Sequence, residues 1–164
     1  MHRRLPKNVK ARWAAMALLA LTPSPSQADP LILIGVMGND FQTVDIAENR
    51  RTGDIVRTWL VTRNWQMQNI RGHMIRTLKN QVEVNCSRRE IRALFSFGQD
   101  DSDAFIFQER LPGIWTPIPP GSAFVDLLRI VCIGPTATDP TFDDMAHLIR
   151  TQRDVAEHPI RGPN

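Results

Sequence analysis

The two cysteines of this 164-residue sequence, Cys86 and Cys132, could form a covalent bond with each other. In an oxidising compartment their default product is a disulfide. It would close a loop of roughly 47 residues, which the chain-entropy model values at about 4 kcal/mol. A reactive thiol or a metal-binding pair is the alternative, but no further nitrogen or sulfur ligand lies near either cysteine at the spacing of a metal site.

Beyond the first 28 residues, three histidines could carry protons or bind a metal: His73, His147 and His158. Metal and catalytic sites often show such residues at recognisable spacings, such as H-x-x-x-H or H-E-x-x-H. None of the three has either spacing. We therefore interpret them as separate surface side chains and expect no metal and no cofactor.

Acidic side chains occur in two groups. Asp100, Asp101 and Asp103 could bind calcium, but the glycine and the distal glutamate of an EF-hand loop are missing, which favours a solvated turn. Asp143 and Asp144 are adjacent, so on a helix they point in different directions. This geometry is poor for an acid–base pair and suits the first turn of a helix.

Two further side chains have both a chemical and a structural interpretation. Ser122 has no G-x-S-x-G surroundings and precedes an apolar helical pattern, which favours helix capping over nucleophilic attack. Trp115 could stack on a ligand, but a tryptophan before a proline run more often packs over a sheet edge. Because no catalytic set emerges, we expect no catalytic residues and a protein that is not an enzyme.

A cluster of arginines could bind an anion. Arg88, Arg89 and Arg92 lie close together in the sequence, and Arg88 and Arg92 should share the wet face of one strand. Glu83 and Glu90 can offset these charges, so a solvated face is the simpler interpretation. The pattern assigns no residue to ligand binding.

The first 28 residues resemble an export signal. A cationic segment with five Lys or Arg and no acid precedes the apolar run Trp13–Leu21. Small residues at Ser26 and Ala28 predict cleavage after Ala28. Nine apolar residues rise only about 14 Å as a helix, well short of the ~30 Å hydrocarbon core. We therefore expect a signal peptide over 1–28 that is cleaved, not a membrane anchor.

Charge and composition limit the class of protein. The chain carries 20 Lys and Arg against 17 Asp and Glu, but five of the cations lie in the expected leader, so the remainder is slightly acidic. Nucleic acid is therefore not favoured as a partner. No later segment is long and apolar enough to span a membrane. An apolar content of 42% is typical of a folded domain.

The elements that must position these residues begin with strands. Several segments are rich in β-formers or alternate between apolar and polar side chains, as Gln81 to Cys86 does. The expected strands are Leu31–Met37, Phe41–Ile46, Asp54–Arg63, Met74–Asn85, Arg89–Phe97 and Ala104–Glu109. We expect connections over Glu48–Gly53 and Asn64–Gly72. Strands joined in this way favour an antiparallel meander.

Two helices are expected after the strands. Pro117, Pro119 and Pro120 exclude a central strand. The apolar residues that follow have the spacing of one helical face: Phe124, Leu127, Leu128 and Val131. This helix should end near Cys132, before Gly134 and Pro135. A weaker helix is expected from about Thr141 to Val155, followed by a frayed tail from His158.

Three features occur in a distinctive order. A strand ends at Cys86 and is followed by Arg88 and Arg89; next comes the segment WTPIPPGS, Trp115–Ser122; then a short amphipathic helix closes on Cys132. In this order they resemble the surface-adhesin protein E family of Gram-negative bacteria. The resemblance runs from about Phe41 to Cys132. It implies an antiparallel sheet with a helix held against one face by the disulfide, and a non-enzymatic role in binding host matrix and serum proteins.

Together these observations give an α+β fold: an antiparallel meander, a disulfide-tethered helix and a C-terminal helix. We expect a signal peptide over 1–28, an adhesin-like domain over 29–135 and a helical extension with a tail over 136–164. The expected function is an exported binding domain, periplasmic or secreted in a Gram-negative bacterium, whose partner is an unknown protein or envelope component. A soluble periplasmic helper or enzyme inhibitor is the alternative. The sequence assigns no oligomeric state.

Overall fold

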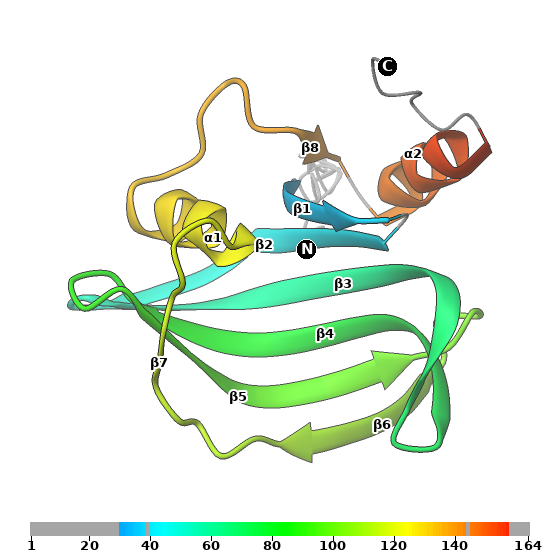
Figure 1. The fold of residues 1–164 in the computed structure, drawn as a ribbon, viewed down its shortest axis with the longest axis horizontal. Coiled ribbons are helices and arrows are strands. Elements are labelled where there is room, and N and C mark those ends of the chain that lie inside the picture. Colours follow the sequence, from blue (N-terminus) through cyan, green and yellow to red (C-terminus); the bar gives the residue numbers. More distant parts are fainter. Residues whose placement is uncertain (1–29, 39, 144, 158–164) are drawn as a thin grey trace, which may run out of the picture.

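The computed structural model describes residues 30–38, 40–143 and 145–157. Its main feature is an eight-stranded antiparallel sheet with two helices (Figure 1). In chain order the elements are β1 (Leu31–Met37), β2 (Asp40–Thr52), β3 (Ile55–Ile70), β4 (His73–Asn85), β5 (Glu90–Gln99), β6 (Phe105–Arg110), β7 (Thr116–Pro117), α1 (Ala123–Cys132), β8 (Thr141–Phe142) and α2 (Met145–Glu157). The expected leader over 1–28 and the tail from His158 lie outside the described residues.

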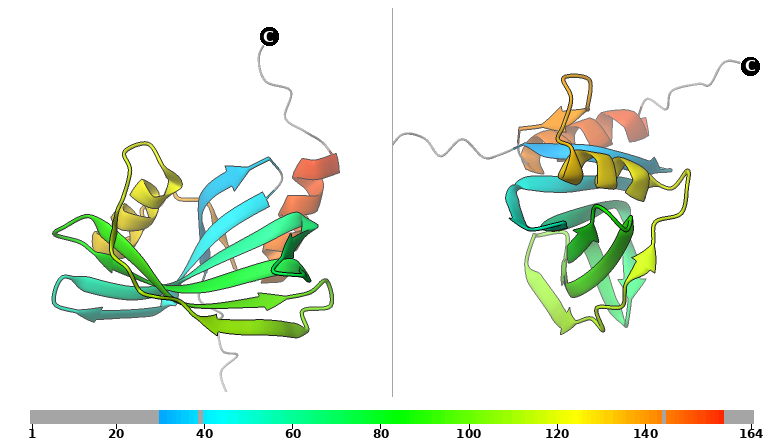
Figure 2. Two further views of the ribbon diagram at one scale, coloured as in Figure 1. Left: turned by 60° about the horizontal axis from the view of Figure 1, so that its bottom comes forward. Right: turned by 90° about the vertical axis from the view of Figure 1, so that its left-hand side faces the viewer.

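The strand order is β6-β5-β4-β3-β2-β1-β8, and β7 pairs with β5 beyond the end of β6. From β1 to β6 each strand pairs with the next in the sequence, so the expected meander is confirmed. Figure 2 shows that the strands are strongly twisted. Pro117 lies in the two-residue β7, on the outer edge of β5, where its missing N–H leaves no gap inside the sheet. Neither described helix has the length and hydrophobicity that a membrane span needs.

Two large bulges let β2 and β3 run further than expected. In β2, residues 46–49 face only Thr58 of β3, and in β3, residues 64–67 face only Arg76 of β4. Side chains satisfy part of the freed backbone. The hydroxyl of Thr58 donates to the carbonyl oxygen of Asp45 at 3.1 Å, and Nη1 of Arg76 donates to two bulge carbonyl oxygens.

The expected connections over Glu48–Gly53 and Asn64–Gly72 are therefore in the right place but too long, since most of their residues lie in strands. Both segments read as loops because they are polar, yet their polar side chains support the bulges or face solvent while the strands continue. The turns themselves take two residues each, at Gly53-Asp54 and at Arg71-Gly72. Arg71 and Gly72 both have a positive φ, at 55° and 85°, as tight hairpin turns require.

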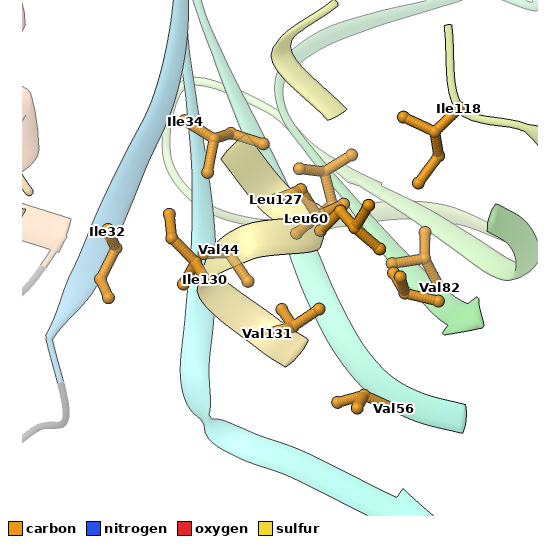
Figure 3. Close-up of a cluster of buried hydrophobic side chains, with 12 residues drawn as sticks. Ile32, Ile34, Val44, Val56, Leu60, Val82, Ile118, Leu127, Ile130 and Val131 are labelled. Atoms are coloured by element: carbon orange, nitrogen blue, oxygen red, sulfur yellow. The ribbon is translucent and has the colours of Figure 1, made fainter. Parts of the chain in front are cut away.

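The main core lies between α1 and one face of the sheet (Figure 3). Leu127, Leu128 and Val131 of α1 are buried, as the helical spacing of this segment predicts, and Ile130, which lies outside the predicted face, is buried as well. They pack on apolar side chains that alternate along the strands, among them Ile32, Ile34, Val44, Val56, Leu60, Val82 and Val84. Burial of this continuous apolar surface is what holds α1 on the sheet.

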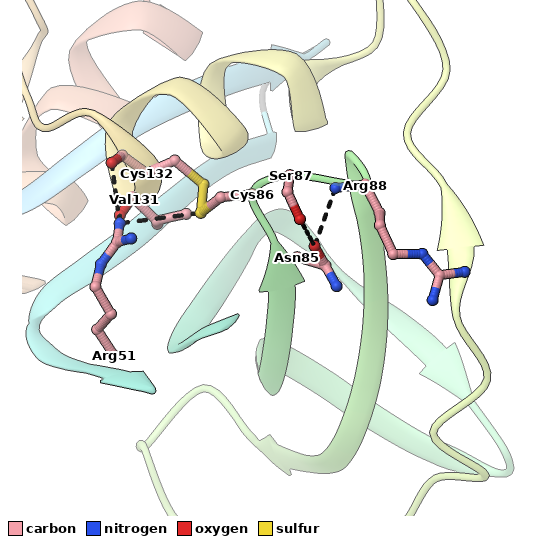
Figure 4. Close-up of a disulfide and its surroundings, with 7 residues drawn as sticks. All are labelled: Arg51, Asn85, Cys86, Ser87, Arg88, Val131 and Cys132. Atoms are coloured by element: carbon pink, nitrogen blue, oxygen red, sulfur yellow. Dashed lines mark hydrogen bonds between the residues drawn. A yellow bond between two sulfur atoms is a disulfide. The ribbon is translucent and has the colours of Figure 1, made fainter. Parts of the chain in front are cut away.

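A disulfide closes the same interface at the C-terminal end of α1 (Figure 4). The Sγ atoms of Cys86 and Cys132 are bonded at 2.03 Å, and their Cα atoms are 5.7 Å apart. Arg51 adds a polar contact, because its Nη2 donates to the carbonyl oxygens of Val131 and Cys132, at 3.3 and 2.9 Å. A cation at a helix C-terminus is favourable for the helix dipole. The sequence pattern did not predict this role for Arg51.

The second helix begins later than expected. Thr141 and Phe142 do not form its first turn; they form β8, which pairs with Leu31 and Ile32 of β1. The helix α2 starts at Met145. Phe142 is an apolar residue that is buried in a strand, although its spacing to the following residues also fits a helix.

The two helices pack on opposite faces of the sheet. A smaller cluster beneath α2 contains Leu31, Phe41, Phe142 and Leu148. In β1 and β2, whose side chains alternate between faces, Leu31 and Phe41 point away from the side that α1 covers. Since Gln152 of α2 also donates to the carbonyl oxygen of Arg63, α2 covers the face opposite α1 near β1, β2 and the bulged end of β3.

Candidate functional site

A carboxylate between two guanidinium groups lies on the face opposite α1. Arg57 of β3, Glu83 of β4 and Arg92 of β5 are directly opposite one another in the strand register. Nε and Nη2 of Arg57 donate to Oε1 of Glu83 at 3.1 and 2.7 Å. Nε and Nη2 of Arg92 donate to Oε2 at 2.8 and 2.5 Å. Each carboxylate oxygen thus receives a pair of charge-assisted hydrogen bonds.

The exposure of these groups differs. The side chain of Glu83 is 7% exposed, whereas those of Arg57 and Arg92 are 50% and 31% exposed. Burial alone would raise the pKa of Glu83, but the hydrogen bonds and charges of the two arginines outweigh it and lower the pKa. Glu83 therefore remains an anion that orients both guanidinium groups, while part of each still faces solvent.

Arg57 and Arg92 also line two adjoining pockets, which we call the arginine groove. One pocket, of about 420 Å³, includes Arg110 and Phe95, and the other, of about 270 Å³, includes Arg50. Four arginines therefore line the groove, with Glu83 as the carboxylate among its lining residues; Arg50 also pairs with Glu48 at 3.7 Å, so the balance still favours positive charge. This excess of positive charge is suited to an acidic ligand, and arginine forks match carboxylate and sulfate oxygens.

Trp115 lies at the edge of this site. The guanidinium carbon of Arg92 is 4.4 Å from the centre of the Trp115 ring, which is the geometry of a cation–π contact. Trp115 is half-buried, just before the edge strand β7. It therefore packs over a sheet edge and at the same time fixes the position of Arg92.

An apolar pocket of about 450 Å³ lies on the other face of the sheet, next to α1. Its walls include Leu60, Val82, Ile91 and Phe124, and it is bordered by the segment Leu111–Ile114 between β6 and β7. Ile114 is 70% exposed. The sheet thus carries an apolar pocket on one face and a cationic groove on the other.

The arginine pattern in the sequence was only partly informative. Arg88 is not on a strand with Arg92, because it lies in the loop between β4 and β5, where it pairs with Glu90 at 3.1 Å. Arg89 lies in the same loop, with a φ of 55°. Of these three arginines, Arg92 alone lines the groove. The other arginines of the groove, Arg50, Arg57 and Arg110, come from distant parts of the sequence, and only the strand register could have revealed that they lie together.

The histidines and acidic residues are dispersed. His73 stacks on Phe107 at 5.8 Å, and His147 lies 3.6 Å from Asp143. His158 and Asp144 are outside the described residues. Asp100 accepts hydrogen bonds from Ser102 and from the Ala104 N–H within its turn.

Within 30–38, 40–143 and 145–157, no group of three or more His, Cys, Asp or Glu side chains could hold a metal ion. Ser122 is placed as expected but does not cap the helix with its side chain. It is at the N-cap position of α1, but its hydroxyl makes no capping bond and donates instead to the carbonyl oxygen of Pro119 at 2.8 Å.

Comparison with known proteins places the chain in a family. No curated protein matches the sequence. A sequence model of surface-adhesin protein E matches residues 36–133. This range begins within β1, contains the arginine groove and ends just after Cys132, whereas β8 and α2 lie beyond it. The matched range covers more than half of the chain and includes both cysteines, so the chain belongs to the surface-adhesin protein E family.

Proposed function

We propose that this protein is an exported, non-enzymatic binding domain that holds an acidic macromolecule in the arginine groove. The observation that carries the proposal is the register of Arg57, Glu83 and Arg92, which presents two oriented guanidinium groups between the further cations Arg50 and Arg110. Membership of an adhesin family supports a role in binding outside the cytoplasm. The partner is a protein or envelope component that carries carboxylate or sulfate groups.

The groove is suited to binding rather than to catalysis. Glu83 has its two oxygens occupied by four arginine hydrogen bonds and a lowered pKa, so it is a poor general base. Arginine side chains have hydrogen-bond donors and no acceptor. What they provide is a fixed array of donors.

The proposal extends to the organisation of the chain. A signal peptide over 1–28, cleaved after Ala28, would deliver a domain over 29–135, with 136–164 as a C-terminal extension. Protease treatment of intact cells tests where this domain is displayed. Digestion in intact cells supports a surface adhesin, whereas resistance combined with release on osmotic shock supports a soluble periplasmic protein.

Binding to heparin and to polyglutamate, each immobilised, tests the groove. Wild-type protein should bind at least one of them saturably, and binding should weaken as salt is added. The variant Arg50→Gln/Arg110→Gln leaves both arginine partners of Glu83 in place and should bind about three- to tenfold more weakly.

The matched control is Arg89→Gln/Arg150→Gln, which removes the same charge from exposed positions outside the groove. This control should bind like the wild type. Equal weakening in both variants would show that only net charge matters, and no saturable binding to either polymer would contradict an acidic ligand.

A further inference from the structure

A separate pocket lies where α2 meets the bulged segment of β3. The amide of Gln152 donates to the carbonyl oxygen of Arg63 at 2.9 Å and joins the helix to the strand there. The pocket has a volume of about 270 Å³ and is lined by Arg63, Trp65, Arg76, Asp101, Ile149, Gln152 and Arg153. This volume lies just below the usual range for small-molecule sites, about 300–1,000 Å³, so a small ligand fits it better than a macromolecule.

Arg63 is the most unusual residue of this pocket. It is only 7% exposed, and its Nη1 donates to the Thr77 hydroxyl at 3.0 Å. The nearest carboxylate oxygen, on Asp103, is 3.9 Å away. The buried Nε makes no hydrogen bond within the described part of the chain. A guanidinium group that is buried with such loose compensation is costly, and an additional anion would relieve the cost.

Two more arginines converge on the same pocket. Nε of Arg76 donates to Asp101 at 2.6 Å, and its Nη1 donates to main-chain oxygens of the β3 bulge, so this guanidinium is held in one orientation. Arg153 of α2 is exposed and forms no ion pair with any described residue. Against Asp101 and Asp103, the three arginines leave one positive charge uncompensated.

We propose that this pocket, named here the α2 pocket, binds a small ligand that carries a tetrahedral oxyanion, phosphate or sulfate. Arg76 and Arg153 line the pocket and supply donors for its oxygens, and the buried charge of Arg63 adds to the attraction. Trp65 provides an apolar wall for a sugar or other group attached to the anion. The α2 pocket is independent of the arginine groove, because the two share no residue, and Arg153 lies outside the range that matches the family.

Isothermal titration calorimetry in a chloride buffer tests this proposal with three probes: inorganic phosphate, sulfate and glucose 6-phosphate. The wild type should bind at least one of them saturably. Tighter binding of glucose 6-phosphate than of inorganic phosphate would identify an organic phosphate as the natural source, whereas equal binding would identify the free ion.

The exposed Arg153 provides a variant that should fold normally. Arg153→Gln should weaken binding about tenfold, the loss expected for one charge-assisted hydrogen bond. Arg150→Gln, on the same helix but outside the pocket, should bind like the wild type, and so should Arg50→Gln/Arg110→Gln of the groove. Absence of saturable binding for all three probes, or equal losses in Arg153→Gln and Arg150→Gln, would overturn the proposal.

Discussion

The two faces of the sheet are stabilised in different ways. On the first face, α1 buries a continuous apolar core and is covalently attached through Cys132. On the second face, α2 covers only a small cluster around Leu148, and the remaining surface carries arginines held by carboxylates and main-chain oxygens. The first face therefore accounts for most of the stability, while the second exposes groups that can bind a ligand. The predictions below test this division of roles.

The largest effect should come from the disulfide on the first face. Cys86→Ser/Cys132→Ser should lower the free energy of unfolding by about 4 kcal/mol, because the loop between the two positions becomes unconstrained in the unfolded chain. Urea denaturation of wild type and variant measures this difference. If the variant were as stable as the wild type, α1 would be held by its apolar contacts alone.

Truncation of one buried leucine on each face compares the two helices directly. Leu127→Ala should cost about 3 kcal/mol of global stability, since the cavity would lie inside the larger core. Leu148→Ala is matched in type and burial, with both side chains 0% exposed. It should cost about 2 kcal/mol or less, because the small cluster beneath α2 can relax around the change.

Amide hydrogen exchange further distinguishes the effects of Leu127→Ala and Leu148→Ala. Leu148→Ala should speed exchange in α2 before it does so in the central strands, whereas Leu127→Ala should speed exchange throughout. If both variants lost the same global stability and the same protection, the two faces would be equally important for stability, contrary to the comparison.

The charge cluster on the second face should have a smaller and pH-dependent effect. Glu83→Gln should cost about 1–2 kcal/mol at neutral pH, because Arg57 and Arg92 lose their shared anion but remain partly solvated. In the wild type, the lowered pKa of Glu83 stabilises the fold fully above the ordinary value of 4.5.

This stabilisation should be lost as the pH falls through the folded pKa, which lies below 4.5. Urea titrations at a series of pH values should therefore show a stability gap between wild type and Glu83→Gln that narrows in acid. A gap that stayed constant down to low pH would mean that Glu83 stabilises the sheet by shape and not by charge.

The smallest effect should be at the start of α1. Ser122→Ala should cost less than about 0.5 kcal/mol, below the ~1 kcal/mol of an ordinary N-cap, because the serine hydroxyl makes no bond to the helix backbone. Thermal denaturation can resolve this difference from a full cap. A loss of 1 kcal/mol or more would show that Ser122 caps α1 in solution.

Much of the first face could be predicted from the sequence because its signals are local and periodic. The 3.6-residue spacing of Leu127 and its neighbours predicted α1, and the two-residue alternation around Val82 and Val84 predicted β4. The disulfide between the two cysteines could be predicted once an oxidising compartment was assumed. Such patterns repeat within a few residues and need no knowledge of the register.

The second face could not be predicted because its contacts join residues from separate strands. Arg57 meets Glu83 and Arg92 only through the strand register, and the bulge at residues 64–67 of β3 lies between the β3–β4 turn and the pairing of Arg57 with Glu83. A bulge shifts the side-chain alternation of every later residue in its strand. Polar segments such as Asn64–Gly72 resemble loops unless the side chains that support the bulge, here Arg76, are already known.

The strand order also has a consequence for the way the chain assembles as it emerges, N-terminus first, during synthesis. From β1 to β6 each hairpin pairs segments that are neighbours in the sequence, so the meander can form progressively, beginning at the N-terminal end. Among the described strands, β7 returns to β5, and β8 pairs much further back, with β1 more than 100 residues earlier. The open edge of β1 is therefore exposed to other chains until almost the whole polypeptide has emerged.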